Sequence, residues 1–343
     1  MLDNSEQKKK NSFQLIALAI IFTLSLFYLS IEIPRVINEY LLGFYPDIHP
    51  VLEPERVESF IAFLMPIGLI CLAIVVILIF VGFYIEKRKI TSLGSFLLFL
   101  PSFGHFVAAM LFLAGIGILQ VMYLPLLNSE YNILDLGFVI NVPILTLDIF
   151  FNWIQSRSTF TNILRNLIVF SGLLIFVLGV LAWFNGKRSR SGVYDSSVYK
   201  YSRHPQYLGF LIWSYGIHSL SFPVYSFPMG ANWISYSLPW LFSALIVVSV
   251  AFFEDIKMNE SNPEVYGDYR SRTQFLIPLP KFVRNALLFP LKKVFKKDFP
   301  ENGKEIFFII LFYGGICVLI SFILILFNID ELLNTCLREL WYS

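Results

Sequence analysis

Long runs of apolar residues constrain this chain more than any other feature of its sequence. A membrane-spanning helix needs about 20 mostly apolar residues, and seven runs approach or exceed that length. They are Phe13–Ile33, Phe60–Tyr84, a stretch within Leu93–Leu127, Leu167–Phe184, Tyr207–Ser221, Leu238–Phe253 and Ile306–Phe327. Of the 343 residues, 57% are hydrophobic and 15% are charged, a balance outside the range of soluble domains. These runs predict an all-α, polytopic transmembrane helical bundle with about seven spans.

Two neighbouring runs differ from the others in their length and in the link between them. Tyr207–Ser221 and Leu238–Phe253 are short, and the link is aromatic, contains Pro and carries almost no charge. This pattern predicts a tight helical hairpin. A further apolar stretch, Phe138–Ile154, is expected to be re-entrant or interfacial because four residues interrupt it. The interrupting residues are Asn141, Pro143, Asp148 and Asn152.

Lys and Arg residues gather in the short segments between the apolar runs. They occur in the N-terminal segment, at Lys87–Lys89, at Lys187–Arg190 and within residues 257–304. Because cytoplasmic loops carry an excess of such residues, we expect the N-terminus and these segments in the cytoplasm, with the C-terminus outside. The first run, Phe13–Ile33, is interpreted as an uncleaved anchor because no small-residue cleavage site follows it. The net charge of +2 is too small to indicate a nucleic-acid partner.

The segment Lys281–Lys304 alternates apolar residues with Lys. Such a pattern is typical of a helix that lies on the membrane surface against anionic lipid headgroups. A solvated linker is the alternative interpretation.

The stretch YKYSRHPQYLGF, residues 199–210, places a cation, an imidazole, tyrosines and a proline at the start of an apolar run. Pro205 suits the first position of a helix, where its missing N–H is not needed. His204 and Tyr207 would share a face near the helix N-terminus, whose N–H groups suit an anion such as a carboxylate. Gly209 would let a ligand or a neighbouring helix approach closely. Anchoring at the interface by Arg and Tyr is the alternative.

Glu254 and Asp255 directly follow the apolar run that ends at Phe253. Inserting a carboxylate into a membrane costs about 2.5 to 3.5 kcal/mol on insertion scales, so an acid that faces inward needs a partner. A cationic ligand would supply one, because a unit charge about 4 Å away gains roughly 4 kcal/mol at an effective dielectric of about 20. The alternative is a solvated helix end.

The stretch SVYKYSRHPQYLG resembles the R-H-P-x-Y-x-G signature of the integral membrane methyltransferases. That family includes isoprenylcysteine carboxyl methyltransferase and the phospholipid amine methyltransferases. In its members an acidic pair ends the next helix, and two tyrosines and an aliphatic-proline stretch follow. The matching positions here are Glu254 and Asp255, Tyr266 and Tyr269, and Phe275–Pro278. The resemblance covers roughly residues 167–280.

This resemblance implies a methyltransferase that binds S-adenosylmethionine in a cytoplasm-facing pocket and takes a lipid or lipidated acceptor from the membrane. The cofactor's carboxylate calls for helix N–H donors, and its amine and sulfonium call for acids or aromatic faces. The expected regions are an N-terminal transmembrane region of unknown role (1–155), the methyltransferase core (156–280), and an interfacial segment with a C-terminal helix (281–343). The expected cofactor-binding residues are His204, Tyr207, Gly209, Glu254, Asp255, Tyr266, Tyr269 and Arg270, and the expected catalytic residues are Arg203, His204, Tyr207, Glu254 and Asp255.

The chain departs from the family pattern at several positions. Ser197 stands where the family often has Gly, Asp255 where it usually has Glu, and Asn262-Pro263 where Phe-Gly is common. Val250 stands where prenylcysteine methyltransferases tend to carry an Arg before the acidic pair. The last difference argues against a prenylcysteine acceptor and leaves the expected fold unchanged.

The chemistry of the acceptor decides which further groups the site needs. A carboxylate is already nucleophilic and needs a nearby cation, whereas a phospholipid ammonium must first lose a proton to a base. The candidate cations are Arg203, Arg270 and Arg272, and the candidate bases are His204, Glu254 and Asp255. Methyl transfer by positioning needs no metal. The widely spaced cysteines, Cys71, Cys317 and Cys336, indicate neither a metal site nor a disulfide framework.

Two other classes of protein are alternatives. Sterol reductases resemble this architecture and share an R-H-P-x-Y-x-G-like element, but they bind NADPH. In them an Asp usually follows the Gly and a Trp precedes the closing tyrosine, whereas Phe210 follows Gly209 here and residues 254–280 contain no Trp. A non-enzymatic transporter or scaffold would use the signature only for packing. Its path could be lined by intramembrane ionisable residues, namely Glu32, His105, Asp148 and Arg165.

Overall fold

Helices make up nearly all of the described part of the chain in a computed structural model of the protein. The structure describes residues 2–42, 54–85, 122–127, 133–153, 159–189, 193–225 and 237–329, together with a few positions between 87 and 97. Within these residues no β-strand forms, and one isolated parallel bridge joins Ser202 to Gln274. The all-α fold expected from the sequence is confirmed.

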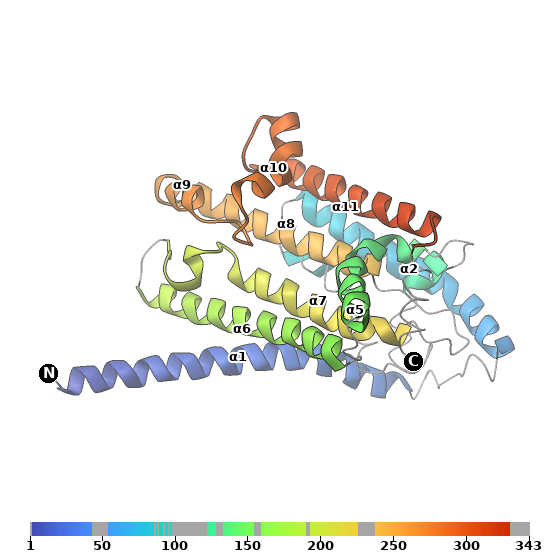
Figure 1. Ribbon diagram of the computed structural model, residues 1–343, viewed down its shortest axis with the longest axis horizontal. Helices are drawn as coiled ribbons and strands as arrows, with labels where there is room; N and C mark the ends of the chain where they lie inside the picture. The colour runs from blue at the N-terminus through green and yellow to red at the C-terminus, as the bar shows by residue number, and fades with distance from the viewer. Residues whose placement is uncertain are drawn as a thin grey trace.

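The long helices α1, α6, α7, α8 and α11 run in broadly the same direction, which is horizontal in Figure 1. The shorter helix α9 lies at the end of α8, and α10 lies beside the start of α11. The helices are α1 (Leu2–Leu42), α2 (Pro54–Tyr84), α4 (Leu124–Leu127), η2 (Ile133–Asn141), α5 (Val142–Trp153), α6 (Thr159–Ser189), η3 (Ser197–Lys200), α7 (Pro205–Tyr225), α8 (Ser237–Ser261), α9 (Pro263–Arg272), α10 (Lys281–Phe295) and α11 (Gly303–Leu326).

Six helical segments of the described chain are long and apolar enough to cross a membrane. Five of them overlap apolar runs that the sequence predicts as spans. The six segments are Ser12–Ser30, Ala62–Tyr84, Ile133–Phe150, Thr161–Arg188, Ser237–Ser261 and Gly303–Leu326. The chain is therefore a multi-pass membrane protein.

Two of the expected spans are not among these six segments. The Tyr207–Ser221 run forms most of α7, but the polar residues of α7 lie inside the bundle, since Ser214, His218 and Ser219 are buried. α7 packs against α8, as the predicted hairpin requires. Most of the Leu93–Leu127 stretch lies outside the described residues.

The segment expected to be re-entrant, Phe138–Ile154, overlaps a stretch that meets the length and composition of a span. Its two halves nevertheless differ in direction: η2 packs along α8 and α11, whereas α5 runs across the neighbouring helices in Figure 1. Two of its polar residues, Asn141 and Asp148, have partners in the bundle. The side-chain oxygen of Asn141 lies 2.8 Å from Nε2 of His218, and Asp148 forms a buried ion pair with Arg165.

Glycines bring α6 and α7 within backbone contact of each other. A Cβ atom on Gly172 would lie 2.3 Å from the backbone nitrogen of Trp213, and one on Gly209 would lie 2.6 Å from that of Phe176. Small residues commonly allow such close packing between helices in membranes. Phe27 of α1 packs against both aromatic residues, so α1 covers the same pair of helices.

Candidate active site

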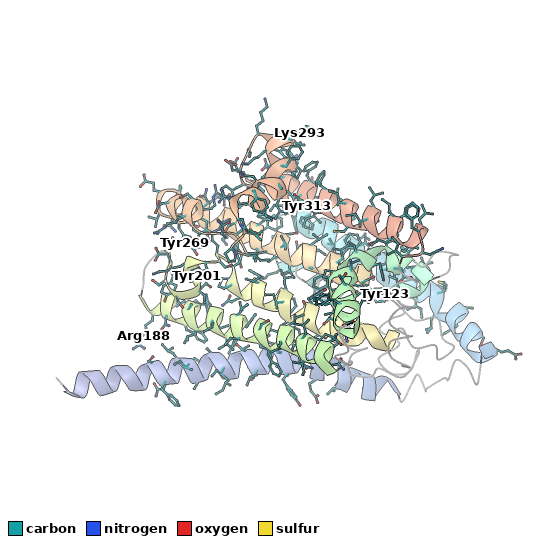
Figure 2. All side chains as sticks on the ribbon, in the orientation of Figure 1. Tyr123, Arg188, Tyr201, Tyr269, Lys293 and Tyr313 are labelled. Carbon is teal, nitrogen blue, oxygen red and sulfur yellow. The ribbon has the colours of Figure 1, made fainter. Side chains whose placement is uncertain are left out.

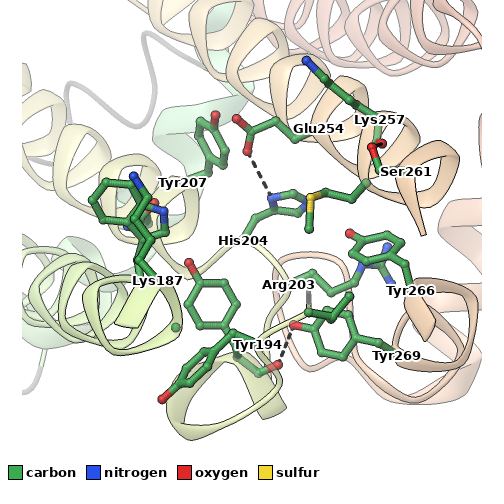
Figure 3. Close-up of a pocket in the computed structure, with 16 residues that line it drawn as sticks. Lys187, Tyr194, Arg203, His204, Tyr207, Glu254, Lys257, Ser261, Tyr266 and Tyr269 are labelled. Carbon is green, nitrogen blue, oxygen red and sulfur yellow. Dashed lines mark hydrogen bonds and ion pairs between the residues drawn. The ribbon is translucent and has the colours of Figure 1, made fainter. Parts of the chain in front are cut away.

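A cavity of about 600 Å³ lies where α6 ends and α7 begins. Its walls come from the ends of α6 and α8, from α9 and from the segment that leads into α7 (Figure 3). Arg188, Tyr201 and Tyr269 mark the same end of the molecule in Figure 2. Six residues that the sequence predicts as site residues line this cavity, namely Arg203, His204, Tyr207, Glu254, Tyr266 and Tyr269.

Arg203 and Asp255 form a buried ion pair at the cavity wall. Nε and Nη2 of Arg203 donate to the two carboxylate oxygens of Asp255 at 3.1 and 2.6 Å. Nη1 donates to the backbone carbonyls of Arg270 and Thr273 at 3.0 and 2.8 Å. The guanidinium thus uses most of its donors within the protein, and this bidentate geometry ties the start of α7 to α8 and to the end of α9.

Asp255 is also the acceptor for two other side chains. Nε2 of His204 lies 2.9 Å from one carboxylate oxygen, and the hydroxyl of Tyr266 donates to the same oxygen. An ionised carboxylate can only accept hydrogen bonds, so His204 carries its proton on Nε2. Asp255 is almost completely buried and is not part of the cavity lining. It therefore acts as the junction that holds α7 and α9 against α8.

The segment after α9 packs directly onto the Arg-His-Pro residues. The backbone N–H of Arg203 donates to the carbonyl of Gln274 at 2.9 Å, beside the isolated parallel bridge. Phe275 stacks on Phe252 of α8 with ring centroids 4.0 Å apart, and it makes an edge-to-face contact with the His204 ring. The two ends of the sequence signature are thus brought together in space.

Three tyrosines, Tyr199, Tyr266 and Tyr269, form a phenolic wall of the cavity. The hydroxyl of Tyr269 donates to the backbone carbonyl of Tyr199 at 2.8 Å. Burial raises the pKa of all three phenols above the usual value of 10.0, and the Asp255 carboxylate raises the pKa of Tyr266 further. At neutral pH these phenols are therefore hydrogen-bond donors rather than bases.

Glu254 differs from its neighbour Asp255 because it faces the cavity. Its side chain is 33% exposed, and Oε2 lies 3.9 Å from Nδ1 of His204. Successive residues of an α-helix point about 100° apart, so only one member of the pair can reach the buried Arg203. Figure 3 shows Glu254 and Tyr207 on the Nδ1 side of His204. Glu254 is thus a carboxylate that a ligand in the cavity can reach.

Several residues that line the cavity were not predicted as site residues. They are Trp183, Gly186, Lys187, Val193, Tyr194, Tyr199, Gln206, Lys257, Met258 and Ser261. The last three follow Glu254 by three, four and seven positions. Residues at this spacing share one face of a helix, so the sequence could have predicted that they lie beside Glu254. Lys187 lies over the Trp183 ring at 3.9 Å from the centroid. Nothing in the local sequence of α6 distinguishes these two from an ordinary basic helix end.

Three of the expected site residues lie outside the cavity lining. Asp255 lies behind it, and Gly209 packs against the backbone of Phe176, so this glycine serves helix packing. The guanidinium of Arg270 lies over the ring of Phe299, 4.3 Å from its centroid. Among the described residues, no group of His, Cys, Asp or Glu side chains could hold a metal ion.

The fold and the cavity together define a multi-pass, all-α membrane protein with a polar site at one end of its bundle. A family described as "Protein of unknown function (DUF1295)" matches residues 158–273, about a third of the chain. Proteins of that family are commonly membrane-associated. The match includes the Arg-His-Pro segment, the acidic pair and the tyrosines of α9. No curated protein and no solved structure matches the chain.

Proposed function

We propose that this protein transfers a methyl group from S-adenosylmethionine to a lipid-like acceptor in the membrane. The observation that carries the proposal is the composition of the cavity. It combines the start of α7, an accessible carboxylate on Glu254 and a wall of aromatic side chains. Its volume of about 600 Å³ is typical of pockets that hold small molecules.

The groups that line the cavity fit the charged groups of the cofactor. The positive end of α7, with Gln206 and Tyr207 in its first turn, suits a carboxylate. Glu254 suits a cationic amine, and the tyrosine faces suit a sulfonium. Bound S-adenosylmethionine would supply an activated methyl group. Arg203 and Asp255 would act as positioning residues because their polar atoms are engaged with each other.

The engaged arginines favour an amine over a carboxylate as the acceptor. Arg203 donates to Asp255 and to backbone carbonyls, Arg270 lies outside the cavity lining, and Arg272 pairs with Asp195 at 2.6 Å. None of these three cations is therefore positioned to hold a carboxylate acceptor. His204 holds its proton on Nε2 against Asp255, so a neutral imidazole would have Nδ1 available to accept a proton from an ammonium.

The first test is a calorimetric titration of S-adenosylmethionine into the purified full-length protein in detergent. We expect binding, and we expect Glu254→Gln to weaken it at least about tenfold, because a lost charge-assisted contact costs about 1.5 kcal/mol or more. Glu264→Gln is the matched control, because Glu264 is an exposed acid on α9 outside the cavity lining. No binding by folded protein would overturn the proposal, and an unchanged affinity of the Glu254 variant would remove Glu254 from the site.

A membrane reductase is the second candidate, and one feature of the cavity favours it. Lys187 and Lys257 both line the cavity and would suit the phosphates of NADPH. The same titration with NADPH separates the two functions. Binding of NADPH without binding of S-adenosylmethionine would replace the methyltransferase proposal.

A further inference from the structure

A second cavity, of about 270 Å³, borders the first only at Arg203. It lies between α8, the segment 273–279, α10 and α11, so most of its wall, 12 of the 17 lining residues, comes from outside residues 158–273. Most of its lining is apolar, with Phe252, Phe275, Leu288 and Leu291 among the side chains that form it. An apolar chain is the kind of ligand that such a lining accepts.

The cavity opens through apolar side chains onto the outside of the bundle. Ile277 and Leu287 belong to its lining, yet they are 51% and 47% exposed. Phe282 and Phe289 of α10 are more than half exposed as well. A helix with exposed aromatic residues and interspersed Lys is typical of the membrane interface. Lipid acyl chains would therefore lie next to this opening.

Two contacts, one within α10 and one just after it, hold this helix beside α11. The hydroxyl of Tyr313 on α11 donates to the backbone carbonyl of Leu287. Just after α10, Nζ of Lys297 lies 2.9 Å from the buried carboxylate of Glu305 at the start of α11. The cavity between the two helices is therefore part of the folded structure.

Arg284 places an unbalanced positive charge in this apolar cavity. Its Nε is inaccessible to solvent and has no hydrogen-bond partner among the described residues. A cation with a buried, unpartnered N–H is costly, so an anionic ligand that pairs with the guanidinium of Arg284 gains affinity. Asp255 balances the charge of Arg203, but no Asp or Glu is among the described residues of the lining. The site therefore suits an anion attached to an apolar chain.

We propose that this cavity binds one anionic membrane phospholipid, with its phosphate on Arg284 and part of an acyl chain against the apolar lining. The phosphate would accept hydrogen bonds from the guanidinium of Arg284, a pairing that is common between arginine and phosphate. The volume of the cavity admits only part of the lipid, and the rest stays in the bilayer. This inference is independent of the methyl-transfer proposal because it uses a different cavity.

The test compares phosphatidylglycerol with phosphatidylcholine of the same acyl chains, bound to the purified full-length protein and measured by native mass spectrometry. We expect phosphatidylglycerol to bind about tenfold more tightly, because the second lipid carries its own compensating cation. Arg284→Gln should remove this preference. Lys293→Gln should keep it, because Lys293 is exposed on the outer side of α10 (Figure 2) and is not part of the lining.

Three results would overturn the proposal. The first is equal binding of the two lipids to the wild-type protein, and the second is an unchanged preference in a folded Arg284 variant. The third is thermal stabilisation by inorganic phosphate as large as that by phosphatidylglycerol, which would indicate an anion site without a lipid. Ile309→Trp would fill the cavity, and it should weaken phosphatidylglycerol binding while the titration of S-adenosylmethionine stays unchanged.

Discussion

Two adjacent acids at the end of α8 have different roles. The sequence predicts both Glu254 and Asp255 as site residues, because nothing in an acidic pair that follows an apolar run shows which of the two faces a ligand. The structure separates them through the helical repeat: Asp255 accepts from Arg203, His204 and Tyr266, whereas Glu254 faces the cavity. Asp255 therefore contributes to the cavity mainly through the residues that it orients.

Replacing Asp255 with Asn should destabilise the protein by about 3 kcal/mol, because removing one partner of a buried ion pair leaves an uncompensated charge. The control is Asp268→Asn, which alters an exposed pair with Arg272 at 3.6 Å and should cost less than about 1 kcal/mol. Thermal unfolding in detergent measures both changes. Equal stability of the two variants would mean that the contacts of Asp255 do not hold α7 and α9 in place.

At the scale of helices, the sequence predicts which segments are apolar better than it predicts how they pack. Five of the predicted runs overlap helices that could span a membrane, because length and apolar composition decide that property and both can be read from the sequence. Gly209 shows why packing is harder to predict, since its sequence context is compatible with the close approach of either a ligand or a neighbouring helix. Only the packing of α7 on α6 reveals that the neighbour is a helix.

Gly209→Ala should weaken the packing of α6 on α7. The added methyl group would lie 2.6 Å from the backbone nitrogen of Phe176, so the two helices must separate, and overpacking of this kind costs about 1 to 3 kcal/mol. Gly315→Ala is the matched control on α11, where the new methyl group meets nothing within 4 Å and should be neutral or stabilising. The midpoint of thermal unfolding should fall for the first variant only. A fall of equal size in both would indicate a general intolerance of alanine.

The architecture of the whole molecule explains why the sequence did not predict ten of the 16 residues that line the cavity. The Arg-His-Pro segment, Glu254 and the tyrosines of α9 could be predicted because they form a motif with fixed spacing. Trp183 and Lys187 reach the cavity only because the glycine contacts of α6 and α7 place the end of α6 there. The ion pair between Asp148 of α5 and Arg165 of α6 likewise could not be predicted, because it depends on how these two helices are arranged in space.

The sidedness of the bundle is a property of the whole molecule that the structure makes testable. In Figure 1 the N-terminus and α9 lie at the same end, and α11 ends at the opposite end. The basic residues near the cavity predict that this end is cytoplasmic. Cys residues introduced at Ser261, which lines the cavity, and at Asn328, which follows α11, should therefore react from opposite sides of the membrane.

In a background without the native cysteines, a membrane-impermeant maleimide added to intact cells should label Asn328→Cys and leave Ser261→Cys unlabelled. Permeabilising the cells should expose Ser261→Cys, because the basic residues near the cavity predict that this end of the bundle faces the cytoplasm. The reverse pattern would place the cavity outside and exclude a cytoplasmic source for its ligand. Labelling of both positions in intact cells would mean that the two ends of the bundle do not lie on opposite sides of the membrane.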